Sequence, residues 1–159
     1  MLFRSKGDDT LYGDGRVIVD SHGVGTSGPI VTYRDVADLP TPEASGNDTL
    51  DGGKGADRLT GGDGSDHFLH HSLTDGKDTI ADFHTGAGGD VLDIHDMLVG
   101  FSAGHEDEFV QCVTAGGNTT VRVDADGALN GSKFTDICVL TGIATDLTTL
   151  VSDGNLALT

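Results

Sequence analysis

The chain has 159 residues, of which 36% are hydrophobic and only 5% aromatic. This length suits one domain, and so few aromatic side chains suit a thin core that needs extra stabilisation. The formal net charge of −17, from 26 acidic and 9 basic side chains, argues against nucleic-acid binding and against docking on anionic lipid, since both need a basic surface.

The N-terminal part combines half of a glycine and aspartate repeat with an insertion. Residues 6–15 read KGDDTLYGDG, where Gly7, Asp9 and Leu11 occupy glycine, aspartate and apolar positions. We interpret this segment as an early coil that is interrupted by residues 16–42. The insertion contains apolar runs bounded by glycine and proline, which predicts a loop or a hairpin.

From residue 46 to residue 69, glycine, aspartate and an apolar residue recur every nine positions, in GNDTLDGGKGADRLTGGDGSDHFL. The glycines permit a tight turn, and the three residues after each aspartate form a short strand with one inward side chain. Two nonapeptides therefore complete one coil. Aligned on G-G-x-G-x-D-x-U-x, the aspartates are Asp48, Asp57 and Asp66, and the apolar residues are Leu50, Leu59 and Phe68.

Stacked aspartates in such a coil predict a bound cation. Equivalent loops are eighteen residues apart, so Asp48 lies above Asp66 (66 − 48 = 18) and Asp57 faces the region of Asp75 (57 + 18 = 75). Carboxylates about 5 Å apart repel by about 3 kcal/mol at an effective dielectric of 20. A hard cation with six to eight oxygen ligands, from carboxylates and loop carbonyls, indicates calcium over magnesium or zinc. A flexible Gly/Asp-rich linker, the alternative, has no fixed period.

After residue 75 the nine-residue period is lost, although glycine still marks the turns. Downstream, apolar alternation at 119–124, a turn at 126–127, an apolar run at 136–140 and a short helix capped at Asp146 are expected. An antiparallel arrangement would cover the open end of the last coil. We therefore divide the chain into a coiled part, residues 1–95 with the insertion at 16–42, and a β-rich cap, residues 96–159.

Several motifs together carry a resemblance to a known family. The succession GGxGxDxF, then DGKDTIADFHTGAGGDVLDIHDML, then TTVRV, DICVLTGI and LVSDGNLALT resembles the C-terminal RTX domain of bacterial proteins exported by type I secretion, in the form found at the end of giant surface adhesins. The resemblance covers about residues 43–159, with a weaker match at 7–15. It implies an all-β fold, namely a right-handed parallel β-roll with an antiparallel β-rich C-terminal cap that contains an uncleaved secretion signal.

The resemblance also implies calcium ligands, position by position. The implied side-chain ligands are Asp48, Asp57 and Asp66, with Asp78 or Asp75 completing the last site and Asp9 in the weaker early match. The implied backbone carbonyl ligands are Gly46, Gly53, Gly55, Gly61 and Asp63. The chain departs from the pattern at residues 43–45, where glycines are missing.

The implied function is calcium-dependent folding and export, in a protein that is secreted or held at the bacterial cell surface and takes part in cell adhesion. The implied partners are an ABC transporter, a membrane-fusion protein and an outer-membrane channel. We expect a monomer that binds no nucleic acid. Membrane insertion is not expected, because no segment approaches eighteen consecutive apolar residues. Residues 1–4 also lack the apolar run of a signal peptide.

Catalysis is not expected, since the chain contains no G-x-S-x-G, H-E-x-x-H or G-x-x-x-x-G-K-[ST] motif. Two alternatives remain open: the non-catalytic RTX tail of a secreted hydrolase or alginate epimerase, and a calcium-dependent polysaccharide-binding module. Few aromatic residues beyond Tyr12 and Tyr33 are available to stack on sugars near the insertion.

The histidines and cysteines also admit two interpretations each. The histidine spacing matches no established zinc pattern, so solvated or packing roles are favoured over a zinc site. Cys112 and Cys138 could form a disulfide, but two free thiols are the simpler interpretation. The histidines concerned are His67, His70, His71, His84 and His95.

Overall fold

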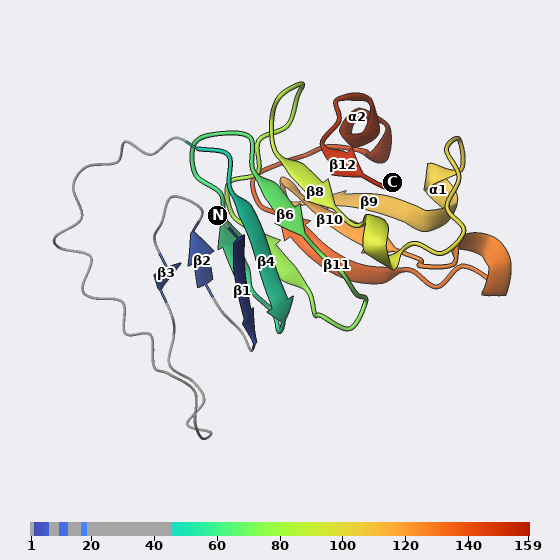
Figure 1. Cartoon of the computed structure of the whole chain (residues 1–159). Coiled ribbons are helices and arrows are strands. Elements are labelled where there is room, and N and C mark those ends of the chain that lie inside the picture. Colours follow the sequence, from blue (N-terminus) through green and yellow to red (C-terminus); the bar gives the residue numbers. More distant parts are fainter. Residues whose placement is uncertain (1, 7–9, 13–16, 19–45) are drawn as a thin grey trace, which may run out of the picture.

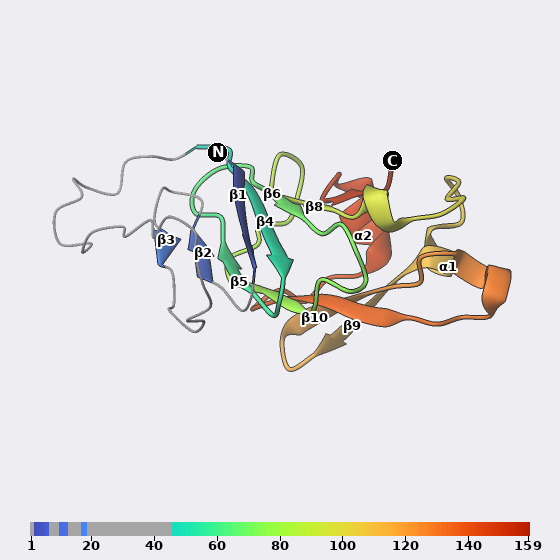
Figure 2. The same ribbon diagram turned by 60° about the horizontal axis from the view of Figure 1, so that its bottom comes forward.

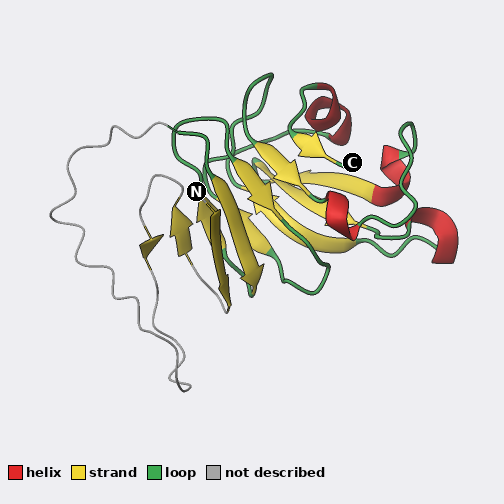
Figure 3. Cartoon of the chain, in the orientation of Figure 1, coloured by secondary structure: helices red, strands yellow, loops and turns green. Residues whose placement is uncertain are grey.

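The computed structural model describes residues 2–6, 10–12, 17–18 and 46–159, and most elements of this described part are short β-strands (Figures 1 and 3). The all-β expectation is therefore confirmed. The N-terminal strands are β1 (Leu2–Lys6), β2 (Thr10–Tyr12) and β3 (Val17–Ile18). The strands of the coiled part are β4 (Thr49–Lys54), β5 (Arg58–Thr60), β6 (His67–Leu69), β7 (Asp78–Ile80) and β8 (Val91–Asp93).

The C-terminal part adds four strands and four short helical segments. The helical segments are the 3₁₀ turn η2 (His95–Met97), helix α1 (Glu106–Phe109), the 3₁₀ turn η3 (Gly127–Asn130) and helix α2 (Leu147–Ser152). The strands are β9 (Val110–Ala115), β10 (Asn118–Val123), β11 (Thr135–Leu140) and β12 (Leu156–Ala157).

From β4 to β8, successive strands alternate between two sheets (Figure 2). The first sheet has the order β1-β4-β6-β8-β12, and every neighbouring pair in it is parallel. The second has the order β3-β2-β5-β7-β11-β10-β9, with parallel pairs from β2 to β11 and antiparallel pairs at both ends. Each step from one sheet to the other and back is one coil of the chain.

The eighteen-residue coil expected from the repeat holds only for the first complete coil. Thr49 pairs with His67, a separation of 18, whereas Leu59 pairs with Ile80, a separation of 21, and His67 with Val91, a separation of 24. The expectation that Asp57 faces Asp75 is therefore wrong, because the longer loop before β7 moves the register by three residues. The backbone N–H of Asp57 instead donates to Asp78 Oδ1 over 3.0 Å.

Each strand from β4 to β8 places one apolar side chain in the core, as the repeat predicts for β4 to β6, and the C-terminal part adds further buried residues. Leu50, Leu59 and Phe68 are at most 1% exposed. In the first sheet, Leu50, Phe68, Leu92 and Leu156 stand in register across β4, β6, β8 and β12. In the second, Leu59, Ile80 and Leu140 do the same across β5, β7 and β11. The rings of Phe68 and Phe83 pack against each other in this core, with centroids 5.9 Å apart.

The C-terminal part extends both sheets and shares their core, so neither sheet is interrupted near residue 95. Strand β11 pairs in parallel with β7, and β12 pairs in parallel with β8. Only β9, β10 and β11 show the antiparallel pairing that was expected. These additions cover the open edges of the last coil with parallel strands. Helix α2 begins as expected after Asp146, whose carboxylate accepts the Thr149 N–H over 2.8 Å.

The N-terminal strands form an early coil, as residues 7–15 suggested. Strands β1 and β2 pair in parallel with β4 and β5. The sequence analysis missed β1, because LFRSK carries neither glycine nor aspartate. Strand β3 returns antiparallel to β2, in agreement with a hairpin at the start of the insertion. Asp9, residues 43–45 and the rest of the insertion lie outside the described residues.

The inward leucine column yields a first prediction. Leu92, which is 1% exposed between Phe68 and Leu156, should lose about 2 to 5 kcal/mol of unfolding free energy in Leu92→Ala, because a cavity would open between two strands. The matched control Leu129→Ala removes a side chain that is 78% exposed, and should change the unfolding free energy by less than about 0.5 kcal/mol. Urea unfolding with calcium present compares them, and equal losses would contradict the assigned core.

Candidate metal site

The turns that precede the strands stack on one another from coil to coil. On the side of the first sheet, the loop 46–48 lies against the loop 61–66, where the Gly46 N–H donates to the Asp63 carbonyl over 3.0 Å. On the side of the second sheet, the loop 55–57 lies against the loop 75–78, where the Gly55 N–H donates to the Asp75 carbonyl over 2.6 Å. Carbonyl oxygens of successive coils are thereby brought together.

Glycine is required where these loops approach most closely. A Cβ on Gly64, at φ 143°, would lie 2.2 Å from the Gly46 carbonyl oxygen. A Cβ on Gly76, at φ 118°, would lie 1.7 Å from the Gly55 carbonyl oxygen. No side chain fits at such distances or favours these φ values. Without Cβ atoms, the backbones of successive loops can therefore approach each other at these carbonyl oxygens.

The aspartates of successive coils form two columns, one beside each sheet. In the first column, the Asp48 N–H donates to Asp66 Oδ1 over 2.8 Å, and the Asp66 N–H donates to Asp90 Oδ1 over 2.9 Å. In the second, the Asp57 N–H donates to Asp78 Oδ1. Asp57, Asp66, Asp78 and Asp90 are buried, with Asp66 and Asp90 fully inaccessible, whereas Asp48 is half-buried. We call the two rows the carboxylate columns: Asp48, Asp66 and Asp90 in the first, and Asp57 and Asp78 in the second.

The carboxyl of Asp66, in the middle of the first column, lies in an unfavourable electrostatic environment. Burial raises the pKa of its carboxyl, the hydrogen bond from the Asp48 N–H partly offsets this rise, and repulsion from Asp90, Asp48 and Asp82 adds to it. Its Oδ2 is buried without a hydrogen-bond partner in the described part of the chain. This oxygen rests against Gly61, where a Cβ would lie 2.3 Å away. The carboxylate is thus buried beside like charges without full compensation.

This environment fits a hard cation that is bound by oxygen. Among the described residues, no group of three or more His, Cys, Asp or Glu side chains is placed to hold a metal ion. Carboxylates together with backbone carbonyls suit calcium with its six to eight oxygen ligands and do not suit zinc. The unpartnered Asp66 oxygen and the loop carbonyls are the groups that fit such an ion.

Most of the expected ligands lie in the stacked loops, but their environments differ. Asp48, Asp57, Asp66 and Asp78 belong to the carboxylate columns, and Asp75 lies in the loop before β7 with its carbonyl already accepting an N–H. Gly46, Gly55 and Asp63 lie at loop contacts. Gly53 has a φ of 78° in β4, and the Gly61 N–H donates to Asp82.

Asp82 and Asp90 were not predicted as site residues from the sequence. Asp82 accepts the Gly61 N–H over 3.0 Å and the Gly62 N–H over 2.9 Å, and so closes the last glycine turn of the repeat. Asp90 Oδ2 accepts the His84 N–H over 2.7 Å. Asp90 follows Asp66 by 24 residues, so a search that allowed the period to lengthen would have found it. Asp82 stands opposite Gly61, 21 residues earlier, so no preceding aspartate points to it.

Both carboxylate columns end on uncharged side chains of the C-terminal part. The Asn155 side chain accepts the Gly86 N–H over 2.8 Å and donates to the carbonyls of Gly86 and Asp90 over 3.1 and 2.8 Å. In the second sheet, Cys138 stands in register with Asp78. Burial raises the pKa of the Cys138 thiol, so it stays neutral. No further carboxylate is added where the columns end.

Cys112 and Cys138 are free thiols, in agreement with the simpler interpretation. Both stand in register with Val121, from β9 and β11 on either side of β10. Two strand spacings separate them by roughly 10 Å, beyond the roughly 7 Å that a disulfide can bridge. Burial raises the pKa of Cys112 to about 11.

Of these five histidines, four pair with aspartates, and His71 and His95 share Asp96. His70 Nδ1 lies 3.3 Å from Asp78, and His84 Nδ1 lies 3.4 Å from Asp90. His71 bridges Asp51 and Asp96, while His95 bridges Asp93 and Asp96, and His67 is exposed.

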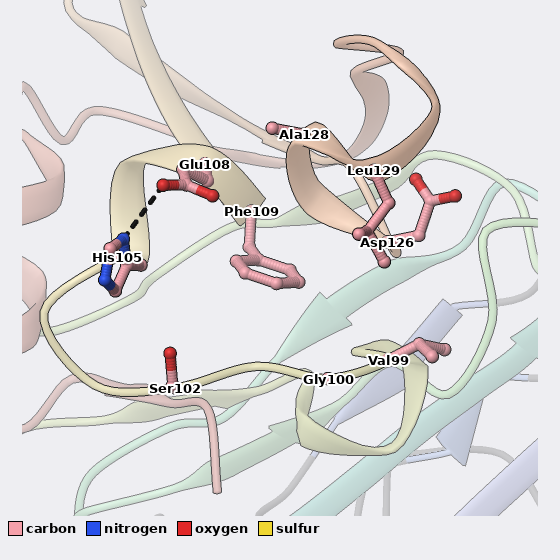
Figure 4. Close-up of a pocket in the computed structure, with 9 residues that line it drawn as sticks. All are labelled: Val99, Gly100, Ser102, His105, Glu108, Phe109, Asp126, Ala128 and Leu129. Atoms are coloured by element: carbon pink, nitrogen blue, oxygen red, sulfur yellow. Dashed lines mark hydrogen bonds and ion pairs between the residues drawn. The ribbon is translucent and has the colours of Figure 1, made fainter.

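A separate pocket of about 480 Å³ lies between α1, η3 and residues 99–102 (Figure 4). The Phe109 ring points into it, and the exposed side chains of Val99 and Leu129 lie at its rim. His105 Nδ1 lies 2.8 Å from Glu108 Oε1, but no hydrogen bond joins it to Ser102 in the described residues. The pocket shares no residue with the carboxylate columns.

A family model supports the metal assignment. Residues 44–70 match the model of the RTX calcium-binding nonapeptide repeat (4 copies). No curated protein matches the chain. Proteins that carry RTX repeats are secreted, and no helix in the described part is long and apolar enough to span a bilayer. The matched segment is thus an array of RTX nonapeptide repeats, and the ion that these repeats bind is Ca²⁺.

Proposed function

We propose that the chain is a calcium-dependent folding and export module from the C-terminal end of a type I-secreted RTX protein, of the giant surface adhesin class. Its architecture would be a right-handed parallel β-roll over residues 1–95 with a β-rich cap over 96–159. Parallel crossovers are right-handed in nearly all proteins. The observation that carries the proposal is the buried Asp66 carboxylate, which lies between like charges inside the matched repeats.

The proposed mechanism couples folding to the calcium concentration. Without calcium, the repulsion within the carboxylate columns opposes folding, so the chain stays unfolded inside the cell and can pass through a transporter. Outside, calcium binds between the coils through the expected aspartates and carbonyls. The coils then fold, which prevents the chain from moving back through the transporter. Export therefore proceeds in one direction.

The magnitudes agree with this mechanism. Extracellular calcium modules have dissociation constants of about 10⁻⁴ to 10⁻³ M. Calcium at 100 times the dissociation constant adds about 2.7 kcal/mol per site. Three sites would then add about 8 kcal/mol, which is comparable with the 5 to 15 kcal/mol of a typical domain.

The C-terminal segment supports a role in export before folding. Leu150, Asn155 and Leu156 are at most 7% exposed in the folded chain. A transporter that reads this segment must therefore meet it before β12 joins β8. The proposed partners are the ABC transporter, the membrane-fusion protein and the outer-membrane channel of a type I system.

Calcium titration of the full chain tests the folding half of the proposal. Far-ultraviolet circular dichroism should show little strand signal with excess chelator and a cooperative gain of strand signal with millimolar calcium. Magnesium at the same concentration should not substitute, because it demands a smaller, near-octahedral shell. Equal strand content with chelator and with calcium would refute the proposed mechanism.

Asp66→Asn should raise the midpoint of the calcium-induced transition at least about tenfold, a loss of about 1.4 kcal/mol, because a charged ligand is removed. The control Asp107→Asn removes a charge from exposed α1 and should shift the midpoint less than about twofold. Because its pKa is raised above 3.8, Asp66 takes up a proton at a higher pH than an ordinary aspartate, so the wild-type midpoint should rise on acidification. An unchanged midpoint in Asp66→Asn would rule this ligand out.

The export half has its own test. A passenger protein fused to residues 96–159 should appear in the medium of cells that contain a matching type I transporter. The same fusion without residues 150–159 should stay inside. Retention of the full fusion, with a known type I substrate exported in the same cells, would count against the signal and leave the calcium mechanism standing.

A further inference from the structure

The outer edge of β9 is an unprotected strand edge. β9 is the last strand of the seven-stranded sheet, and Figure 2 shows it at the margin beyond β10. All six of its residues pair with β10, without a register shift. Within the described residues no strand pairs with its other side. That side therefore presents unpaired backbone donors and acceptors.

β9 lacks the sequence features that normally protect an edge, although the Thr114 hydroxyl donates to the Thr145 carbonyl over 3.1 Å in the loop before α2. Such edges are short, or they carry charges, proline or a bulge. β9 is six residues long, and the chain has no charged residue from Phe109 to Val121. Gln111, Val113, Thr114 and Ala115 are exposed, and Val113 retains 45% of its surface. A protected edge would not combine this length with exposed, uncharged, β-forming side chains.

The lack of charge along residues 109–121 permits contact with a second copy, in spite of the net charge of the chain. A second copy also carries −17, so most of its surface repels the first. The neutral stretch 109–121 is a place where two copies can meet without opposing carboxylates. In an antiparallel arrangement, Glu106, Asp107 and Glu108 before β9 of one copy lie beside the neutral turn Gly116–Gly117 of the other. A parallel arrangement would set the acidic residues of α1 against each other.

We propose that β9 pairs antiparallel with β9 of a second copy of this chain, about a two-fold axis near Val113. The two seven-stranded sheets then form one continuous sheet. This departs from the monomer expected from the sequence. The interface is small, because one pair of six-residue strands buries less than the roughly 1,000 Å² of a stable complex. The dissociation constant should therefore lie between about 1 µM and 1 mM.

Sedimentation equilibrium of the full chain in millimolar calcium tests the proposal. Over roughly 1 µM to 1 mM protein, the weight-average mass should rise from 16.3 kDa toward twice that value. Val113→Lys places a charge on the edge and should hold the mass at the monomer value. Val99→Lys, which alters another exposed valine away from β9, should associate like the wild type. Circular dichroism and the calcium midpoint should be unchanged in both variants.

Three results would overturn the proposal: a wild type that stays monomeric over the whole range, a Val113→Lys variant that associates like the wild type, or equal loss of association in the Val99→Lys control. Hydrogen exchange adds a positional readout, because the outward amides of β9 should exchange more slowly as the protein concentration rises. The measurement uses folded, calcium-loaded protein, so its outcome is independent of whether the chain is exported.

Discussion

Repulsion between buried aspartates of successive coils is the constraint on which this structure depends. The coils stack at strand spacing, so Asp48, Asp66 and Asp90 are held close together in one column. Backbone N–H groups compensate part of the charge of Asp66 and of Asp90, but one oxygen of Asp66 has no such donor in the described part of the chain. In the proposed function, calcium supplies the missing charge and loop carbonyl oxygens complete its shell. Under that proposal, the burial that makes the folded chain compact also makes it dependent on an ion.

The coils can differ in length because the strands keep the register while the loops take up the extra residues. Register is fixed by one inward side chain per strand, and it is kept from Leu50 to Leu156 although the spacing grows. The extra residues are taken up in the loops before β7 and β8. Asp82 and Asp90 then meet the preceding loops at the longer spacing. Loss of the nine-residue period in the sequence is therefore no sign that the stack has ended.

The sequence predicts those structural features that depend on residues close together in the chain. Leu50, Leu59, Phe68 and the stacked aspartates follow from a local repeat, and the α2 cap at Asp146 follows from one side chain. The parallel pairing of β11 with β7 joins Leu140 to Ile80 across sixty residues, and no motif marks such a distant partner. Asn155 meets Asp90 in the same way, across 65 residues. These contacts depend on which edges the last coil leaves open, a property of the assembled sheets.

The uncharged ends of the carboxylate columns give the stack a polarity. Asn155 and Cys138 close one end, whereas β1 and β2 continue the same two sheets at the other. A pair of nonapeptides added within residues 46–69 would lengthen both sheets by one strand and leave the closed end unaltered. The number of stacked coils and the contacts that close the columns at Asn155 and Cys138 can therefore vary independently. Stacks of very different length can end in the same closing contacts.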